Sequence, residues 1–145
     1  MDVQKAPGGN ERRIQVTDTD LERLEEMISI YGKGRFEDAC DALDAELANA
    51  IVVDSREIRA DVVTMNSTVI FEEEGSGQRR EMTLVFPRDA DPEQGRISIL
   101  APVGSALLGL AVGESIDWPL PGGKHRRFRI VEVVYQPEAA GDYEH

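Results

Sequence analysis

The stretch ISILAPVGSALLGLAVGESIDWPLPGG, from Ile97 to Gly123, decides the fold of this chain. It begins with a short apolar strand, is interrupted at Pro102 and Gly104, and continues into one or two turns of helix. Small and aliphatic residues form that helix: Ala106, Leu107, Leu108 and Leu110. Because the leucines leave almost no polar face, the helix has to be covered by a sheet. We therefore expect the rest of the chain to supply that sheet.

Apolar residues at alternating positions predict the strands of this sheet. Met82, Leu84 and Phe86 share one face of a strand over residues 81–86, and residues 74–77 before it carry a glycine-rich hairpin signal. Further strands are predicted near residues 69–72, 97–99, 116–118 and 126–135. Four or five antiparallel strands around one short buried helix predict an α+β sheet domain.

Two short helices are predicted before the sheet. Thr17 is a good N-cap for the first helix. Helical spacing then relates four residues of that helix and four of the next: Leu21, Leu24, Ile28 and Tyr31, then Phe36, Cys40, Leu43 and Leu47. The loop Gly32-Lys33-Gly34 between them predicts an antiparallel helical hairpin, a short coiled coil. Each arm of about 14 residues is roughly 20 Å long, which is short for a coiled coil.

Four segments follow from this pattern. Residues 1–13 are expected to be a mobile arm, because they carry proline and glycine and almost no apolar residue. Residues 14–52 form the helical hairpin and residues 53–136 the sheet domain. Residues 137–145 are a polar tail, which we expect to be partly ordered.

Composition limits the class of partner. The 145 residues include 16 basic and 28 acidic side chains, a net charge of −12. Nucleic-acid phosphates repel such a chain, so we expect a protein partner with a basic surface and no direct, specific binding of nucleic acid. No apolar run reaches the roughly 18 residues of a membrane span. The single cysteine fits a reducing compartment, and the cytoplasm is the expected location.

Motifs for catalysis or metal binding fail on inspection. Cys40 lies in the apolar register of the second helix and is expected in the core. His125 and His145 have no second ligand nearby in sequence for zinc. Gly122-Gly123-Lys124 lacks the first glycine and the Ser or Thr of a phosphate loop. Residues 89–95 resemble a calcium loop, but the glycine falls one position late and position 100 is Leu where a bidentate Glu is needed. We therefore predict no catalytic residue, no metal and no cofactor.

Two charged clusters are candidates for partner contact. The hairpin tip contains Lys33, Arg35, Glu37 and Asp38. Its acids have a structural explanation as well, since the helix dipole stabilises acids in a first turn. The basic patch contains Lys124, Arg126, Arg127 and Arg129. Its alternative explanation is a solvated strand face that neutralises nearby acids.

Several motifs resemble two related bacterial families. ISILAPVGSALLGLAVGESI is similar to the C-terminal domain of the Gre transcript-cleavage factors. The segment DVVTMNSTV over residues 61–69, together with residues 120–123 and 135–143, is closer to the Rnk family, the regulators of nucleoside diphosphate kinase. The resemblance implies an FKBP-like C-terminal domain, an N-terminal helical hairpin, and binding to RNA polymerase near its secondary channel in competition with Gre factors.

The resemblance also shows where this chain departs from Gre factors. In those factors a long coiled coil reaches the active centre, and acidic tip residues help to hold the catalytic magnesium. Here the hairpin is short, and Lys33 and Arg35 precede the acids of the tip. We therefore predict a monomeric, non-enzymatic transcription regulator that does not stimulate cleavage and affects nucleoside diphosphate kinase indirectly. The alternatives are an FKBP-like peptidyl-prolyl isomerase and a direct regulator of the kinase.

Overall fold

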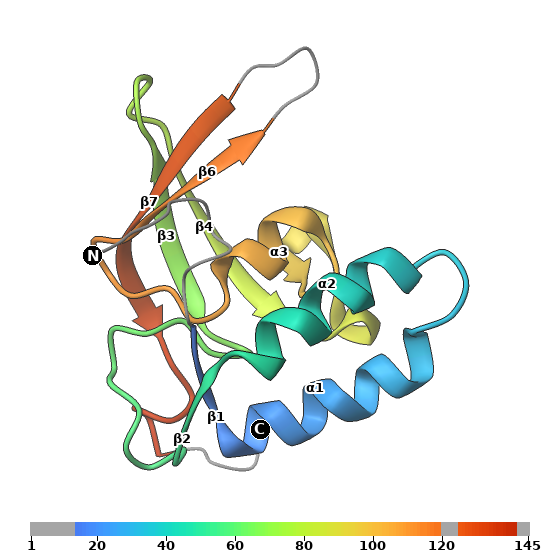
Figure 1. The fold of residues 1–145 in the computed structure, drawn as a ribbon. Helices are drawn as coiled ribbons and strands as arrows, with labels where there is room; N and C mark the ends of the chain where they lie inside the picture. Colours follow the sequence, from blue (N-terminus) through green and yellow to red (C-terminus); the bar gives the residue numbers. More distant parts are fainter. Residues whose placement is uncertain (1–13, 120–124, 142–145) are drawn as a thin grey trace, which may run out of the picture.

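The computed structural model describes residues 14–119 and 125–141 and confirms the α+β class, with a helical hairpin followed by a sheet (Figure 1). The hairpin consists of α1 (Asp18–Tyr31) and α2 (Glu37–Ala48), flanked by β1 (Gln15–Thr17) and β2 (Ile51–Val53). The sheet domain consists of β3 (Thr68–Glu73), β4 (Arg79–Val85), β5 (Arg96–Ser98), α3 (Pro102–Leu107), β6 (Ser115–Pro119) and β7 (His125–Tyr135). Two 3₁₀ turns, η2 (Pro87–Asp89) and η3 (Pro92–Gln94), connect β4 to β5. The predicted Pro-Gly turn at residues 119–123 lies largely outside the described residues.

Five strands form the main sheet in the order β5-β4-β3-β7-β6. The hairpin β3–β4, the pair β3–β7 and the pair β6–β7 are antiparallel, as predicted. The prediction of a wholly antiparallel sheet is wrong at one edge, where β5 pairs with β4 in parallel. The connection through η2 and η3 is long enough to bring the chain back to the start of a parallel neighbour, which a tight hairpin turn cannot do.

The first helix of the hairpin begins where the sequence predicts. Thr17 caps α1, and its Oγ1 accepts a hydrogen bond of 3.0 Å from the N–H of Asp20. Beyond α2 the chain returns to pair β2 with β1 in parallel, with Gln15 opposite Ile51. A parallel pair needs a long crossover connection, and the whole helical hairpin is that crossover. The tip therefore lies at the end of the hairpin that is farthest from β1 and β2 (Figure 1).

The buried helix of the opening stretch starts earlier than predicted. Pro102 and Gly104 lie inside α3 and do not interrupt it. Proline is tolerated in the first turn of a helix, because its missing N–H has no partner there anyway. A Cβ on Gly104 would come within 2.0 Å of the Ser98 carbonyl oxygen, so only glycine lets α3 approach β5 so closely. The leucines Leu107, Leu108 and Leu110 are at most 1% exposed, which confirms their predicted burial. The prediction that Leu108 and Leu110 belong to the helix is wrong, because α3 ends at Leu107 and Gly109 between them has a left-handed φ of +82°.

One contiguous core joins the hairpin to the sheet domain. Leu24, Cys40 and Leu43 of the hairpin belong to the same cluster as Leu84 and Ile130 of the sheet. Polar contacts cross the same boundary. The buried Asp20 carboxylate accepts a 3.0 Å hydrogen bond from the N–H of Met65, and Asp18 accepts one of 3.2 Å from Ser55.

The residues where the sheet domain meets the predicted tail are buried in the fold. Gln136 and Glu138 are 3% and 4% exposed. The Gln136 amide donates to the carbonyls of Arg59 and Val62 at 2.7 and 2.8 Å, and Glu138 accepts from the Thr64 hydroxyl at 2.8 Å. A polar segment can be buried when its groups are paired in this way.

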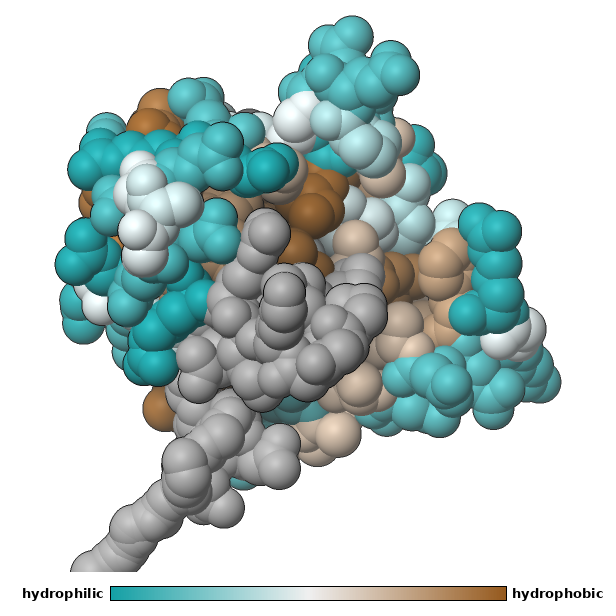
Figure 2. Space-filling model, turned by 90° about the horizontal axis from the view of Figure 1, so that it is seen from above, coloured by the Kyte–Doolittle hydropathy of each residue, from teal (hydrophilic) through white to brown (hydrophobic). Residues whose placement is uncertain are grey.

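Hydrophilic residues cover most of the surface that Figure 2 shows from above, and hydrophobic residues are visible near its centre and at its left edge. Among the described residues, no helix is long and apolar enough to cross a membrane.

Candidate functional site

The hairpin tip is a tight turn fixed by aromatic packing. Tyr31 at the end of α1 meets Phe36 edge to face, with ring centroids 5.9 Å apart. The Arg35 guanidinium carbon lies 4.8 Å from the centroid of the Phe36 ring. The N–H of Glu37 donates to the carbonyl of Gly34, which has the left-handed φ of +88° that glycine adopts readily. These contacts give the tip a defined shape.

All four charged residues predicted at the tip are exposed: Lys33, Arg35, Glu37 and Asp38. Glu37 and Asp38 lie in the first turn of α2, and Lys33 and Arg35 lie in the connecting loop. The tip therefore presents two cations ahead of two carboxylates. Its acids lie where the helix dipole already stabilises them.

The basic patch is only partly described. Lys124 lies outside the described residues, and so does the side chain of Arg126, whose backbone belongs to β7. Arg127 and Arg129 are exposed on β7 and face acids of β3 and the following turn, with nitrogen–oxygen distances of 3.7 Å to Glu74 and 3.9 Å to Glu72. Glu72 also binds Arg79 at 2.9 Å. These pairs fit the alternative explanation, a strand face that neutralises nearby acids.

The cysteine is a core residue, as predicted. Cys40 is fully buried in the hairpin. Burial raises the pKa of its thiol, and the neighbouring Asp41 carboxylate raises it further. Such a thiol is a poor nucleophile, because the thiolate is the reactive form. Within residues 14–119 and 125–141, no three His, Cys, Asp or Glu side chains are grouped to hold a metal ion.

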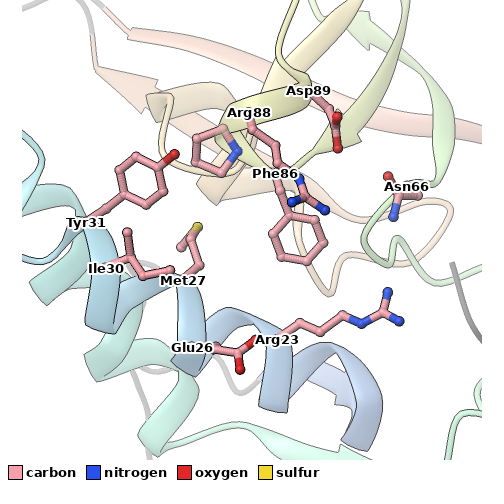
Figure 3. A pocket seen from close by; sticks show the side chains of 10 residues that line it. Arg23, Glu26, Met27, Ile30, Tyr31, Asn66, Phe86, Arg88 and Asp89 are labelled. Carbon is pink, nitrogen blue, oxygen red and sulfur yellow. The ribbon is translucent and has the colours of Figure 1, made fainter.

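The structure also contains a groove that the sequence did not indicate. It has a volume of about 560 Å³ and lies between α1 and the end of β4 with η2 (Figure 3). Its apolar lining includes Met27, Ile30, Tyr31 and Phe86. Met27 and Ile30 fall beside the predicted stripe of α1, at a helical spacing of three. This pair, three positions apart on one side of α1, was the signal in the sequence for an apolar surface there.

Comparison with known proteins gives the family. Residues 12–53 match the family described as Rnk N-terminus, and residues 58–135 match the family described as transcription elongation factor, GreA/GreB, C-term. The chain is 45% identical over 130 residues to the regulator of nucleoside diphosphate kinase from Escherichia coli (strain K12), covering 90% of this chain and 95% of that relative. The chain belongs to the Rnk family.

Two further matches connect the chain to Gre factors. The chain is 32% identical over 95 residues to the transcription elongation factor GreA of Syntrophus aciditrophicus, and this match covers 66% of this chain but only 58% of that relative. A solved structure of a prokaryotic transcription elongation factor GreA/GreB from Nitrosomonas europaea is 52% identical and superposes with a TM-score of 0.72, covering 86% of this chain and all of that one. The Gre-like fold is therefore shown, and the predicted family is confirmed.

Proposed function

We propose that this chain is a non-enzymatic transcription regulator that binds RNA polymerase near its secondary channel and does not stimulate transcript cleavage. In this proposal the sheet domain, with its FKBP-like character, docks on the polymerase. The helical hairpin then occupies the mouth of the channel, where it competes with Gre factors.

The length of the hairpin carries the proposal. With 14 and 12 residues, α1 and α2 are about 21 and 18 Å long at 1.5 Å per residue. Core packing extends along most of the hairpin, through Leu24 and Met27 of α1 and Cys40 and Leu43 of α2, and Tyr31 beside the tip packs against the same core. The hairpin therefore has little free length beyond the domain. A probe of this length suits a channel mouth better than a distant active centre.

The experiment is a binding and cleavage assay with core RNA polymerase. We expect the chain to bind the enzyme and to be displaced by a Gre factor. With backtracked complexes, we expect no cleavage above the intrinsic rate and slower cleavage by an added Gre factor. Absence of binding at micromolar concentration contradicts the proposal, and so does stimulated cleavage.

The tip is the first proposed contact. The double variant Glu37→Lys/Asp38→Lys should raise the Kd for polymerase about fivefold or more, since it reverses two exposed charges. The matched control is Glu22→Lys/Glu25→Lys, which makes the same charge change at exposed positions of α1 away from the tip. Equal Kd values for the two variants would show that Glu37 and Asp38 do not contact the polymerase.

The basic patch of Lys124, Arg126, Arg127 and Arg129 is the second proposed contact. Because Arg127 and Arg129 already face Glu74 and Glu72, an acidic partner surface has to compete with these acids. We therefore expect Arg129→Ala to change the Kd less than the tip variant does. A larger effect of Arg129→Ala would make the patch the main contact.

The name of the Escherichia coli relative, regulator of nucleoside diphosphate kinase, favours a link to that kinase. We propose that the link is indirect, through expression of the kinase. The test measures the activity of purified kinase with and without the chain. A change in kinase activity without polymerase present would establish direct regulation.

A further inference from the structure

We propose that the groove between α1 and η2 receives an apolar segment of the polymerase that carries an acidic side chain. This inference rests on the proposed function, since it names the part of the partner that the chain recognises. The groove lies on the side of α1 that faces the sheet domain, so its occupant touches both parts of the chain.

Exposed apolar surface is the first observation. Ile30 is 73% exposed although it lies on a helix that is packed into the core. Phe86 reaches toward Met27 from the opposite wall, and Tyr31 closes one end of the groove (Figure 3). An isolated exposed isoleucine needs no explanation, but one that lines a groove with two aromatic rings marks a binding surface.

The groove has the length of a peptide segment. From Arg23 to Tyr31 the lining follows α1 over nine residues, and the eight steps between them span about 12 Å at 1.5 Å per residue. This length matches about two turns of a helix laid along the groove. At the end opposite Tyr31, the Asn66 side chain offers both a donor and an acceptor (Figure 3), as needed to pair with a peptide group.

Charge specifies the segment further. The guanidinium of Arg88 lies next to the Phe86 ring and points into the groove, on the same side as that of Arg23 (Figure 3). Arginine pairs with carboxylates in a two-pronged geometry. Glu26 and Asp89 also line the groove and keep its local charge balanced within an otherwise strongly acidic chain. An apolar segment with one carboxylate near Arg88 therefore fits better than a strongly basic one.

The test uses a charged residue at an exposed position of the groove. Ile30→Asp should raise the Kd for core RNA polymerase about tenfold or more, the size expected for a buried apolar anchor. Ile30→Leu should retain binding within about twofold, because it keeps the apolar side chain. The matched control is Ser29→Asp, which adds the same charge at the adjacent exposed position of α1 outside the groove.

A second variant tests the acidic side chain. Arg88→Glu should weaken binding, whereas Arg80→Glu, the same change at an exposed position of β4 outside the groove, should not. A photo-crosslinking residue at position 30 should attach to a polymerase subunit in the complex.

The outcomes separate this inference from the proposed function. If the unaltered chain binds polymerase and Ile30→Asp binds equally well, the groove assignment is wrong and the proposed function stands. If the unaltered chain does not bind polymerase, the proposed function is wrong, and so is the proposal that a polymerase segment occupies the groove. Self-association of the chain that Ile30→Asp abolishes, measured by sedimentation velocity, would instead assign the groove to a second copy.

Discussion

The carboxylate of Asp20 should hold the hairpin on the sheet domain. Asp20 is fully buried in α1, and its Oδ2 accepts the 3.0 Å hydrogen bond from the N–H of Met65, which is also fully buried. In Asp20→Ala this N–H keeps its place in the core and loses its partner.

The expected cost follows from the type of bond. A hydrogen bond to a charged group contributes about 1.5–3 kcal/mol, and we expect Asp20→Ala to lower the free energy of unfolding by at least this much. For a chain of this size, each kcal/mol shifts the Tm by about 3–5 °C, so the Tm should fall by roughly 5–15 °C. Asp20→Asn keeps an acceptor oxygen, and its loss should be about half as large.

The assay is urea unfolding followed by circular dichroism, together with hydrogen exchange at the Met65 amide. The control is Glu25→Ala, at an exposed position of the same helix, which should change the stability by less than about 0.5 kcal/mol. Asp20→Ala should also speed exchange at Met65. A loss as small as that of the control, with unchanged exchange, would refute the role given to this carboxylate.

Three further predictions concern other parts of the fold. Gly109→Ala should lower the free energy of unfolding by more than about 2 kcal/mol, because φ there is +82° and the new Cβ would lie 2.4 Å from the Cβ of Ile14. The control is Gly113→Ala, where φ is +94° and the space around the new Cβ is open, so that only backbone strain is added. Cys40 should react with iodoacetamide at pH 8 on the order of 100-fold more slowly in the native chain than in urea, because burial raises the pKa of its thiol and blocks access; comparable rates would place the thiol outside the core. Gln136→Ala should lower stability by about 1–2 kcal/mol and speed proteolysis of the last residues, since it removes the two hydrogen bonds to Arg59 and Val62; proteolysis at the unaltered rate would show that these bonds do not hold the segment.

The elements with a strong repeating pattern could be predicted from the sequence. Thr17 as the cap of α1, the glycine loop at the tip and the alternating strands β3 and β4 use local signals that a few residues suffice to show. The stripe of α1 was predicted too narrow. It included Leu24 but not the buried Met27, because α1 packs against α2 on one side and the sheet domain on the other, which widens its apolar face.

The missed features depend on residues far apart in the chain. The parallel pair of β1 with β2 involves three residues on each side and a separation of 36 positions, too short a pattern for any periodicity. Asp20 and Glu138 are acidic residues that the sequence alone would place on the surface. They are buried because each carboxylate accepts a hydrogen bond from a distant residue, Asp20 from the N–H of Met65 and Glu138 from the hydroxyl of Thr64. The groove is missed for the same reason, since its walls come from α1 and from η2.

The contacts at the base of the hairpin also bear on how the proposed regulator acts. A hairpin joined by a flexible linker could search a channel and adopt several directions. Here the β1–β2 pair closes the hairpin at its base, and Asp18, Asp20 and the shared core attach it to the sheet domain. The direction of the tip is therefore set by the fold, and the tip can reach only what lies within about 20 Å of the hairpin base.

Polymerase binding by such a chain should thus depend on matching two surfaces at a fixed spacing, the tip and the docking surface of the sheet domain. The groove lies between α1 of the hairpin and η2 of the sheet domain, so a polymerase segment bound there would contact both units at once.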